Sequence, residues 1–381
     1  MVNRFTTRMV NRFTKRGCDC SKFDCPILKK KYSIHDIARE LGVSATTISF
    51  VLKGNGQEKK VSAPVRQRIL SYIESIGYQP NQVAQSLRTG KSKIIGMLVE
   101  DISDPFFSSI GRIVEDSLYK FGYKIFHAST DNDTDRAKKL LQLFRDRQVD
   151  GYIMAPAPGI EKEILELLHE SKPIVVFDRY FPELPTTNVV IDNKAGAYAA
   201  TLHLIENGFR HIAFVTLNSE QVQMNDRLKG FNIAIEEYKL EYCCLKLNYK
   251  TSAEELTSSI KKFIKKNKEV DAVLFGTNYL AVSGLKAIQE LGLKIPEDIG
   301  MVGFDDNTHF ALFTPSITAV SQPVDQISKK VVQLLINALS DSKSAIKPKT
   351  YTLSAELIVR ESSVRSLVKT SKKSKLNNNL F

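Results

Sequence analysis

Residues 32–53 read YSIHDIARELGVSATTISFVLK, two short apolar segments separated by a glycine. Ser33, followed three residues later by Asp36, predicts a capped helix start. Apolar side chains then recur with helical spacing over residues 34–41. Gly42 is expected to end this helix, because glycine adopts the left-handed turn without steric cost.

The second half of this stretch predicts another helix, with Val43 as a buried pivot and Ser44 as the N-cap. Two short helices joined by a tight glycine turn form a helix-turn-helix, whose second helix can enter the DNA major groove. An ordinary helical hairpin packed in a core is the alternative. The spacing buries Ile48, Val51 and Leu52 and exposes Ala45, Thr46, Ser49 and Phe50.

A third helix is predicted from Ser62, with apolar residues at 65, 69, 73 and 76 on its inner face and Gly77 at its end. A short helix over about 82–88 follows, too short to be stable alone in water. Its Leu87, next to Arg88, is the kind of apolar wedge that enters a minor groove. A flexible linker with an incidental leucine is the alternative.

Charge is distributed unevenly along the 381 residues, whose net charge is +12. Residues 1–31 contain nine Lys or Arg against two Asp, whereas residues 94–364 contain 31 basic against 36 acidic residues. A basic N-terminal part on a mildly acidic body predicts nucleic acid bound at one end. Residues 1–30 are expected to form a disordered basic arm, and residues 365–381 a disordered basic tail.

Several classes of protein are not supported by the sequence. No apolar run of 18 residues predicts a membrane span, and no apolar signal-peptide core is present, so a cytoplasmic protein is expected. Cys18, Cys20 and Cys25 match no zinc spacing, and we predict no metal site. Without a phosphate-cradling glycine loop, a nucleophile elbow or spaced histidines, we predict no enzyme, no catalytic residues and no cofactor.

From Lys93 onward, apolar strands alternate with helices, which predicts parallel sheets covered by helices on both faces. A second series begins at Asp192, so two lobes are expected, with a ligand between them at the strand ends. The predicted strands are 94–100, 124–129, 151–156, 174–178, 211–217, 245–249, 272–276 and 300–305.

Over about residues 31–364 the chain resembles the lac/galactose repressor family of bacterial transcription regulators. The resemblance is carried by DIARELGVSATTISFVLKG, VSAPVRQRILSYIESIGYQPNQVAQSLRTGKSKIIG, DPFF at 104–107 and ELGLKIPEDIGMVGFDD ending at Asp306. It implies an α/β protein with an N-terminal three-helix helix-turn-helix domain, a hinge helix and a two-lobed periplasmic-binding-protein-like sensor. It also implies a homodimer on double-stranded DNA with a palindromic operator.

The same resemblance implies domain boundaries. The helix-turn-helix domain covers residues 31–79, the hinge helix or linker 80–92, and the effector-binding and dimerisation domain 93–364. The chain crosses between lobes three times, so lobe one takes 93–191 and 322–348, and lobe two takes 192–321 and 349–364.

DNA-facing positions follow from the family pattern. Many relatives carry Arg where Phe50 stands, and Arg can bind guanine through two hydrogen bonds. Phe50 cannot, so contact with a thymine methyl or packing on the backbone is expected. Leu87 matches the leucine that the family inserts into the minor groove. The predicted DNA-binding residues are Ser33, Ser44, Ala45, Thr46, Thr47, Ser49, Phe50, Leu87 and Arg88.

The resemblance also marks effector positions. Phe106 and Phe107 match the cleft mouth, with plain helix packing as the alternative, and Arg227 matches an arginine that grips the ligand. Carboxylates and arginine converging on one cleft suit a polyhydroxy effector such as a carbohydrate. The acids could instead be strand-end residues bonded to nearby backbone. The remaining predicted effector residues are Asp178, Arg179, Asn278 (Asp in many relatives), Asp305 and Gln322.

These features together favour a sequence-specific DNA-binding repressor whose operator affinity is controlled by a small effector, a sugar or sugar derivative, bound between the lobes. A sugar-binding receptor without DNA activity is the alternative, against which the module at residues 32–93 argues.

Overall fold

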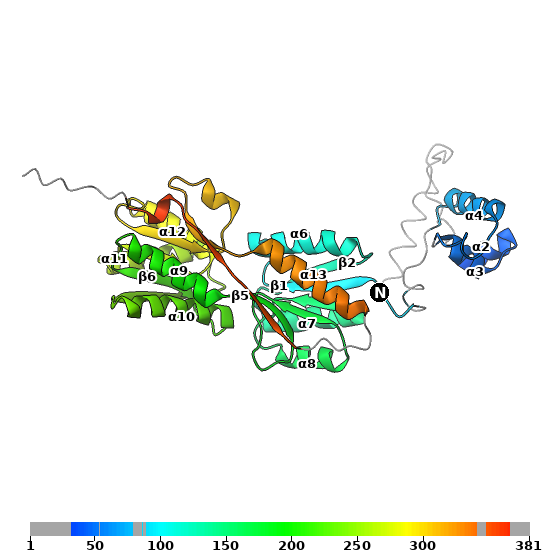
Figure 1. Cartoon of the computed structure of the whole chain (residues 1–381), viewed down its shortest axis with the longest axis horizontal. Helices are drawn as coiled ribbons and strands as arrows, with labels where there is room; N and C mark the ends of the chain where they lie inside the picture. Colours follow the sequence, from blue (N-terminus) through cyan, green and yellow to red (C-terminus); the bar gives the residue numbers. More distant parts are fainter. Residues whose placement is uncertain (1–31, 53, 79–85, 87–88, 341–347, 366–381) are drawn as a thin grey trace, which may run out of the picture. The chain divides into compact units, whose positions relative to one another are not determined.

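The computed structural model describes residues 32–52, 54–78, 86, 89–340 and 348–365 (Figure 1). The predicted basic arm, most of the predicted hinge helix and nearly all of the predicted tail lie outside these residues. The chain divides into two compact units between Thr89 and Gly90, within the expected linker.

The first unit is a three-helix domain formed by α2 (Ile34–Leu41), α3 (Ala45–Leu52) and α4 (Ala63–Ser75). The three helices meet in a small core around Ile37, Ile48 and Ile69, which are fully buried. The predicted helix-turn-helix and its third helix are therefore confirmed.

Capping interactions set the boundaries of α2 as the sequence predicts. The Ser33 hydroxyl accepts a hydrogen bond from the Asp36 amide at 3.2 Å, and the Asp36 carboxylate accepts one from the Ser33 amide at 3.0 Å. Gly42 ends the helix with φ of +61°. Val43 is only partly buried, so its prediction as a buried pivot is wrong; its amide donates to the Ala38 carbonyl at 3.1 Å and helps close the helix.

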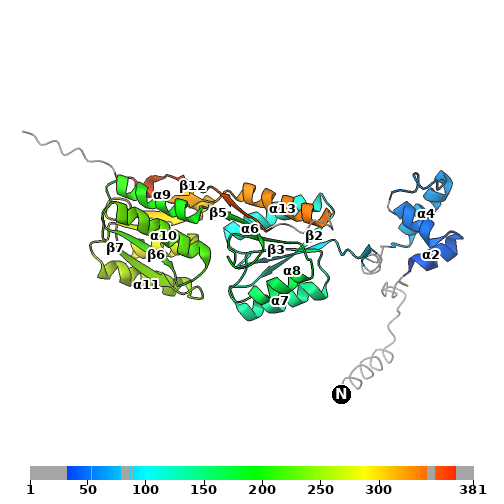
Figure 2. The ribbon, with the colours of Figure 1, turned by 60° about the horizontal axis from the view of Figure 1, so that its bottom comes forward.

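The second unit contains two six-stranded sheets, and the first of them is entirely parallel. Helices α6 (Pro105–Tyr119) and α13 (Val324–Ser340) pack on one face of this sheet, and α7 (Thr134–Asp146) and α8 (Glu161–His169) on the other (Figure 2). The strand order is β11 (Thr350–Leu353), β5 (Thr187–Ile191), β4 (Ile174–Phe177), β3 (Gly151–Met154), β1 (Ile94–Val99) and β2 (Lys124–Ser129).

The second sheet repeats this arrangement, with one antiparallel strand at its edge. Helices α9 (Asn193–Glu206) and α10 (Val222–Glu237) pack on one face, and α11 (Ala253–Lys266) and α12 (Asn278–Glu290) on the other. Because the strand orders correspond, β9 holds the place in this sheet that β4 holds in the first. The order is β12 (Glu356–Ile358), β10 (Thr318–Ser321), β9 (Gly300–Phe304), β8 (Ala272–Phe275), β6 (Ile212–Leu217) and β7 (Tyr242–Leu247).

The predicted α/β fold class is confirmed, but three details differ. Strands β5 and β10 were not predicted, and β7 begins three residues before the predicted strand 245–249. The predicted boundary between residues 348 and 349 is wrong, because β11 pairs with β5 in the first sheet before the chain crosses to β12. The extended run near residue 351 therefore belongs to both lobes, and the chain crosses three times as implied.

Close packing of α9 against α10 depends on Gly230. A Cβ atom at this position would collide with the backbone carbonyl of Lys194 on α9. We expect Gly230→Ala to lower the free energy of unfolding by about 1–3 kcal/mol, the usual cost of overpacking a tight core. Urea unfolding of the variant measures this. Glu236→Ala, at an exposed site on the same helix, is the matched control, and equal stability of both variants would contradict the packing argument.

Candidate functional site

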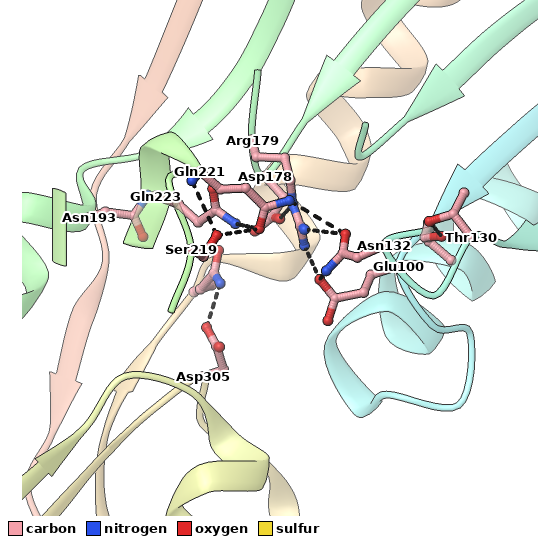
Figure 3. A network of polar contacts seen from close by, with 12 residues as sticks. Glu100, Thr130, Asn132, Asp178, Arg179, Asn193, Ser219, Gln221, Gln223 and Asp305 are labelled. Carbon is pink, nitrogen blue, oxygen red and sulfur yellow. Dashed lines mark hydrogen bonds and ion pairs between the residues drawn. The ribbon is translucent and has the colours of Figure 1, made fainter. Parts of the chain in front are cut away.

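A buried arginine organises the polar residues at the strand ends of the first lobe (Figure 3). Arg179 follows β4, and its Nε donates to Asp178 at 2.8 Å. Its two terminal nitrogens donate to Glu100 at 2.6 Å and to Asn132 at 3.0 Å. Burial disfavours the charged guanidinium, but the carboxylates of Glu100 and Asp178 outweigh this and raise the pKa of Arg179. Arg179 is therefore a fixed cation.

A second buried arginine does the same in the second lobe. Arg227 of α10 contacts Asp305 at 3.3 and 3.4 Å and donates to Asn193 at 2.9 Å and to the Gly276 carbonyl at 2.7 Å. Its guanidinium also lies 3.7 Å above the ring centre of Phe304. Burial raises the pKa of Asp305, while the charge of Arg227 acts in the opposite direction.

The two aspartates occupy corresponding places in the two lobes. Asp178 follows β4 and Asp305 follows β9, with φ of +65° and +67° respectively. Residues other than glycine seldom adopt this left-handed region, although Asp tolerates it better than most. Each lobe thus turns its chain sharply at the same point and presents a carboxylate bound to a buried arginine.

Polar contacts between described residues join the lobes. Asn278 donates to Asp104 at 3.1 Å, and Gln221 donates to Asn132 at 3.4 Å. At the rim, Lys250 forms an ion pair with Asp133 at 2.9 Å. The lobes therefore lie close together around the buried charges.

Between the lobes is a cavity of about 40 Å³, lined by residues of both. Two larger recesses of about 800 and 730 Å³ lie beside it and share Tyr249 and Lys250. Ligand pockets in proteins usually measure about 300–1,000 Å³. A sugar-sized ligand therefore requires the lobes to move apart before it can reach the central cavity.

The structure brings most predicted effector residues together. Five of the polar ones line the central cavity: Asp178, Arg179, Arg227, Asn278 and Asp305.

The other three predicted effector residues are two phenylalanines and Gln322. Phe106 and Phe107 also line the cavity, with buried rings packed edge to face at 5.0 Å between their centres, and their contact with an effector stays a prediction. Gln322 does not line the cavity. It donates to Asp305 at 2.6 Å and borders a separate recess of about 440 Å³.

Several cavity residues were missed by sequence reasoning. Glu100 directly follows β1, and Tyr279 lies in the first turn of α12 after β8. Asn132, in the loop after β2, lines the adjacent recess of about 800 Å³ and accepts from Arg179. The rule that ligands bind at the carboxyl ends of parallel strands could have identified them. Asp104 lay inside the quoted DPFF segment, where it caps α6 by accepting from the Phe106 amide at 2.8 Å.

On the helix-turn-helix, α3 carries most of the predicted DNA-facing residues. Thr46 is exposed, and Ala45, Thr47, Ser49 and Phe50 are partly exposed. Ser33 and Ser44 are exposed and serve as caps, with Ser44 accepting from the Thr47 amide at 3.0 Å. Lys59 lies 5.8 Å from the ring centre of Phe50. Leu87 and Arg88 lie outside the described residues.

The described part of the chain carries neither a membrane-spanning helix nor a cluster of metal ligands. None of its helices is long and apolar enough to cross a membrane. It contains no group of three or more His, Cys, Asp or Glu side chains able to hold a metal ion. The cluster of Cys18, Cys20 and Cys25 lies outside it.

A helix-turn-helix and a two-lobed sensor with a polar interlobe cavity define a ligand-responsive DNA-binding protein. Residues 33–81 match the bacterial regulatory proteins of the lacI family, and residues 201–363 match the periplasmic binding protein-like domain. The chain is 30% identical over 336 residues to the HTH-type transcriptional repressor PurR of Aliivibrio fischeri, covering 87% of this chain and 98% of that protein. The chain belongs to the lacI family.

Other similarities agree with this assignment. The ribose operon repressor of Halalkalibacterium halodurans is 32% identical over 332 residues, 86% of this chain and 96% of that protein. The crystal structure of the lac repressor dimer bound to operator and the anti-inducer ONPF aligns with a TM-score of 0.76 at 20% identity, covering 88% of this chain and 100% of that one. The protein is a DNA-binding transcriptional repressor with a small-effector sensor, not a receptor without DNA activity.

The carboxylate of Asp104 generates a pH-dependent prediction. Burial, followed by the charge of Asp305, raises the pKa of Asp104 from 3.8 to about 6, although the Asn278 hydrogen bond opposes this. A pKa raised on folding means that the ionised carboxylate destabilises the fold above pH 6, and that this cost disappears as pH falls toward 4. We expect Asp104→Asn, which keeps a good N-cap, to raise stability by about 1–3 kcal/mol at pH 7.5.

Thermal unfolding of the wild type and of Asp104→Asn across pH 4–8 measures this effect. The stability gain should shrink steadily as pH falls below 6. Asp101→Asn, at a carboxylate in the preceding loop, is the control and should show no such trend. A gain in Asp104→Asn that is independent of pH would contradict the buried charge as its cause.

Proposed function

We propose that this protein represses transcription as a homodimer on a palindromic operator and that a sugar bound between its lobes sets its affinity for DNA. The observation that supports this most directly is the pair of buried arginine–carboxylate clusters, one per lobe, which face a single cavity. A ligand that contacts both clusters favours one separation of the lobes over another. Such differential binding is what an effector needs in order to shift an equilibrium.

The chemistry of the cavity supports a carbohydrate effector. Carboxylates accept hydrogen bonds from adjacent hydroxyl groups, and buried arginine holds them in fixed positions. The buried rings of Phe106 and Phe107 add an apolar wall, which suits the carbon face of a sugar. The relative from Halalkalibacterium halodurans, named as a ribose operon repressor, agrees with this class.

DNA recognition is assigned to α3. Its exposed face carries Ala45, Thr46, Ser49 and Phe50, short or apolar side chains suited to close contact with base edges and thymine methyl groups. A two-fold dimer would place two such helices in successive major-groove half-sites, which explains the proposed palindrome. Effector and operator then alter each other's affinity reciprocally, by about 1–3 kcal/mol.

Arg227 tests the effector role of the cavity. Arg227→Ala leaves Asp305 buried without its cation, so we expect loss of sugar binding and of the effector response, with operator binding retained. Gel-shift titrations with the operator, with and without the sugar that stabilises the wild type, measure both properties. Glu236→Ala on the same helix is the control. A normal effector response in Arg227→Ala would remove this arginine from the site.

Thr46 tests the proposed DNA surface. Thr46→Ala removes an exposed hydroxyl and methyl from α3 without lowering helix propensity, so we expect operator affinity to fall by about 1–3 kcal/mol. Sugar affinity should stay unchanged. Gln67→Ala, at an exposed site on α4, is the matched control. Equal operator affinity of Thr46→Ala and the wild type would place recognition elsewhere.

A further inference from the structure

The central cavity holds more negative than positive charge. Four carboxylates line it, from Glu100, Asp104, Asp178 and Asp305, against two guanidinium groups, from Arg179 and Arg227. Both arginines already contact carboxylates: Arg179 pairs with Asp178 and Glu100, and Arg227 with Asp305. If Asp104 and Asp305 were both protonated, the net charge of the lining would rise only to zero and would not become positive. No surplus cation among the described lining residues is left for an anionic ligand.

The hydrogen-bonding groups of the cavity also favour a ligand that donates hydrogen bonds. Within the described part of the chain, one oxygen of Glu100 and one of Asp178 accept no hydrogen bond. Asn132 and Arg179 both donate to the other oxygen of Glu100, and Arg179 donates to the other oxygen of Asp178. The carbonyl oxygen of Gln223 lines the cavity, is buried and has no partner among the described residues, and the whole residue is only 2% exposed. The Gln223 oxygen needs a donor from a ligand, because an unmet buried acceptor costs free energy. The free oxygens of Glu100 and Asp178 can accept from the same ligand.

One of the two recesses beside the cavity is also acidic. This recess of about 730 Å³ is lined by Glu100, Asp101, Asp104 and Asp131, against the single cation of Lys250. Lys250 is itself paired with Asp133 across the cleft. A surface of this sign repels anions before they reach the cavity.

We infer that the effector is an unphosphorylated, uncharged polyhydroxy molecule, and that the cavity rejects sugar phosphates and sugar acids. This inference rests on the proposed function, because it concerns the sugar site itself. A sugar hydroxyl donates as well as accepts, so it can satisfy the free oxygens of Glu100, Asp178 and Gln223. A phosphate dianion only accepts, and it would face carboxylates with no unpaired arginine to balance its charge.

The test uses matched pairs of probes on the full-length protein at pH 7.5. The pairs are ribose and ribose 5-phosphate, glucose and glucose 6-phosphate, fructose and fructose 1-phosphate, and glucose and gluconate. Thermal shift identifies a pair that binds, and calorimetry gives both dissociation constants. Arg227→Ala serves as the cleft-defective control, so that phosphate bound to the basic helix-turn-helix domain is not mistaken for cleft binding.

We expect the neutral member of a binding pair to bind at least about tenfold more tightly than its anionic partner, as a like charge in a buried site demands. Asp104→Asn removes one repelling carboxylate. In this variant the ratio of the two dissociation constants, anionic over neutral, should fall severalfold. An anionic member that binds the cleft as tightly as its neutral partner overturns the inference and leaves a sugar-responsive repressor intact. A failure of every neutral and anionic sugar to bind overturns the proposed function as well.

Discussion

Everything that the interlobe site can do depends on two guanidinium groups held away from water. A buried charge is tolerated only when it is paired and hydrogen-bonded, and Arg179 and Arg227 meet this condition through carboxylates supplied by strand ends. Removing one partner of such a pair leaves an uncompensated charge, which costs several kcal/mol. The Arg179 pairs therefore fix strand ends of the first lobe to one another, and the Arg227 pair fixes a strand end of the second lobe to α10. They also keep the space between the lobes polar, because no apolar packing could satisfy the remaining oxygens.

The parts of this architecture that repeat with a clear period were predictable from sequence. Helical spacing and glycine stops predicted the three helices of the DNA-binding unit. The alternation of apolar strands with helices predicted most strands of the sensor. Strands β5 and β10 were missed because each follows another strand with no α-helix between them, so they break the alternation of strands with helices. The double role of the segment around Tyr351 was missed because an extended run gives no sign that its first half pairs with one sheet and its second half with another.

The site was predictable to a similar degree. Asp178 and Asp305 stand directly after apolar strands, so their place at the cavity could be anticipated. Glu100 also stands directly after a strand, and Asn132 lies in the loop after β2, but a single polar residue carries no pattern that separates a site residue from a loop residue. Gln322 was assigned to the cavity although it reaches Asp305 from the far side. The side from which a residue approaches depends on the strand twist and the neighbouring helix, which the local sequence does not encode.

The contacts that join the lobes differ in kind from those inside each lobe. Lys250 and Asp133 are 66% and 39% exposed, and exposed ion pairs contribute about 1 kcal/mol or less. Asp104, which accepts from Asn278 across the cleft, has no cation partner among the described residues. Its burial raises its pKa although the Asn278 hydrogen bond lowers it, so burying this charge opposes closure. A ligand that donates hydrogen bonds to Asp104 and its neighbours offsets the cost of burying these oxygens, so occupancy can control lobe closure with a modest binding energy.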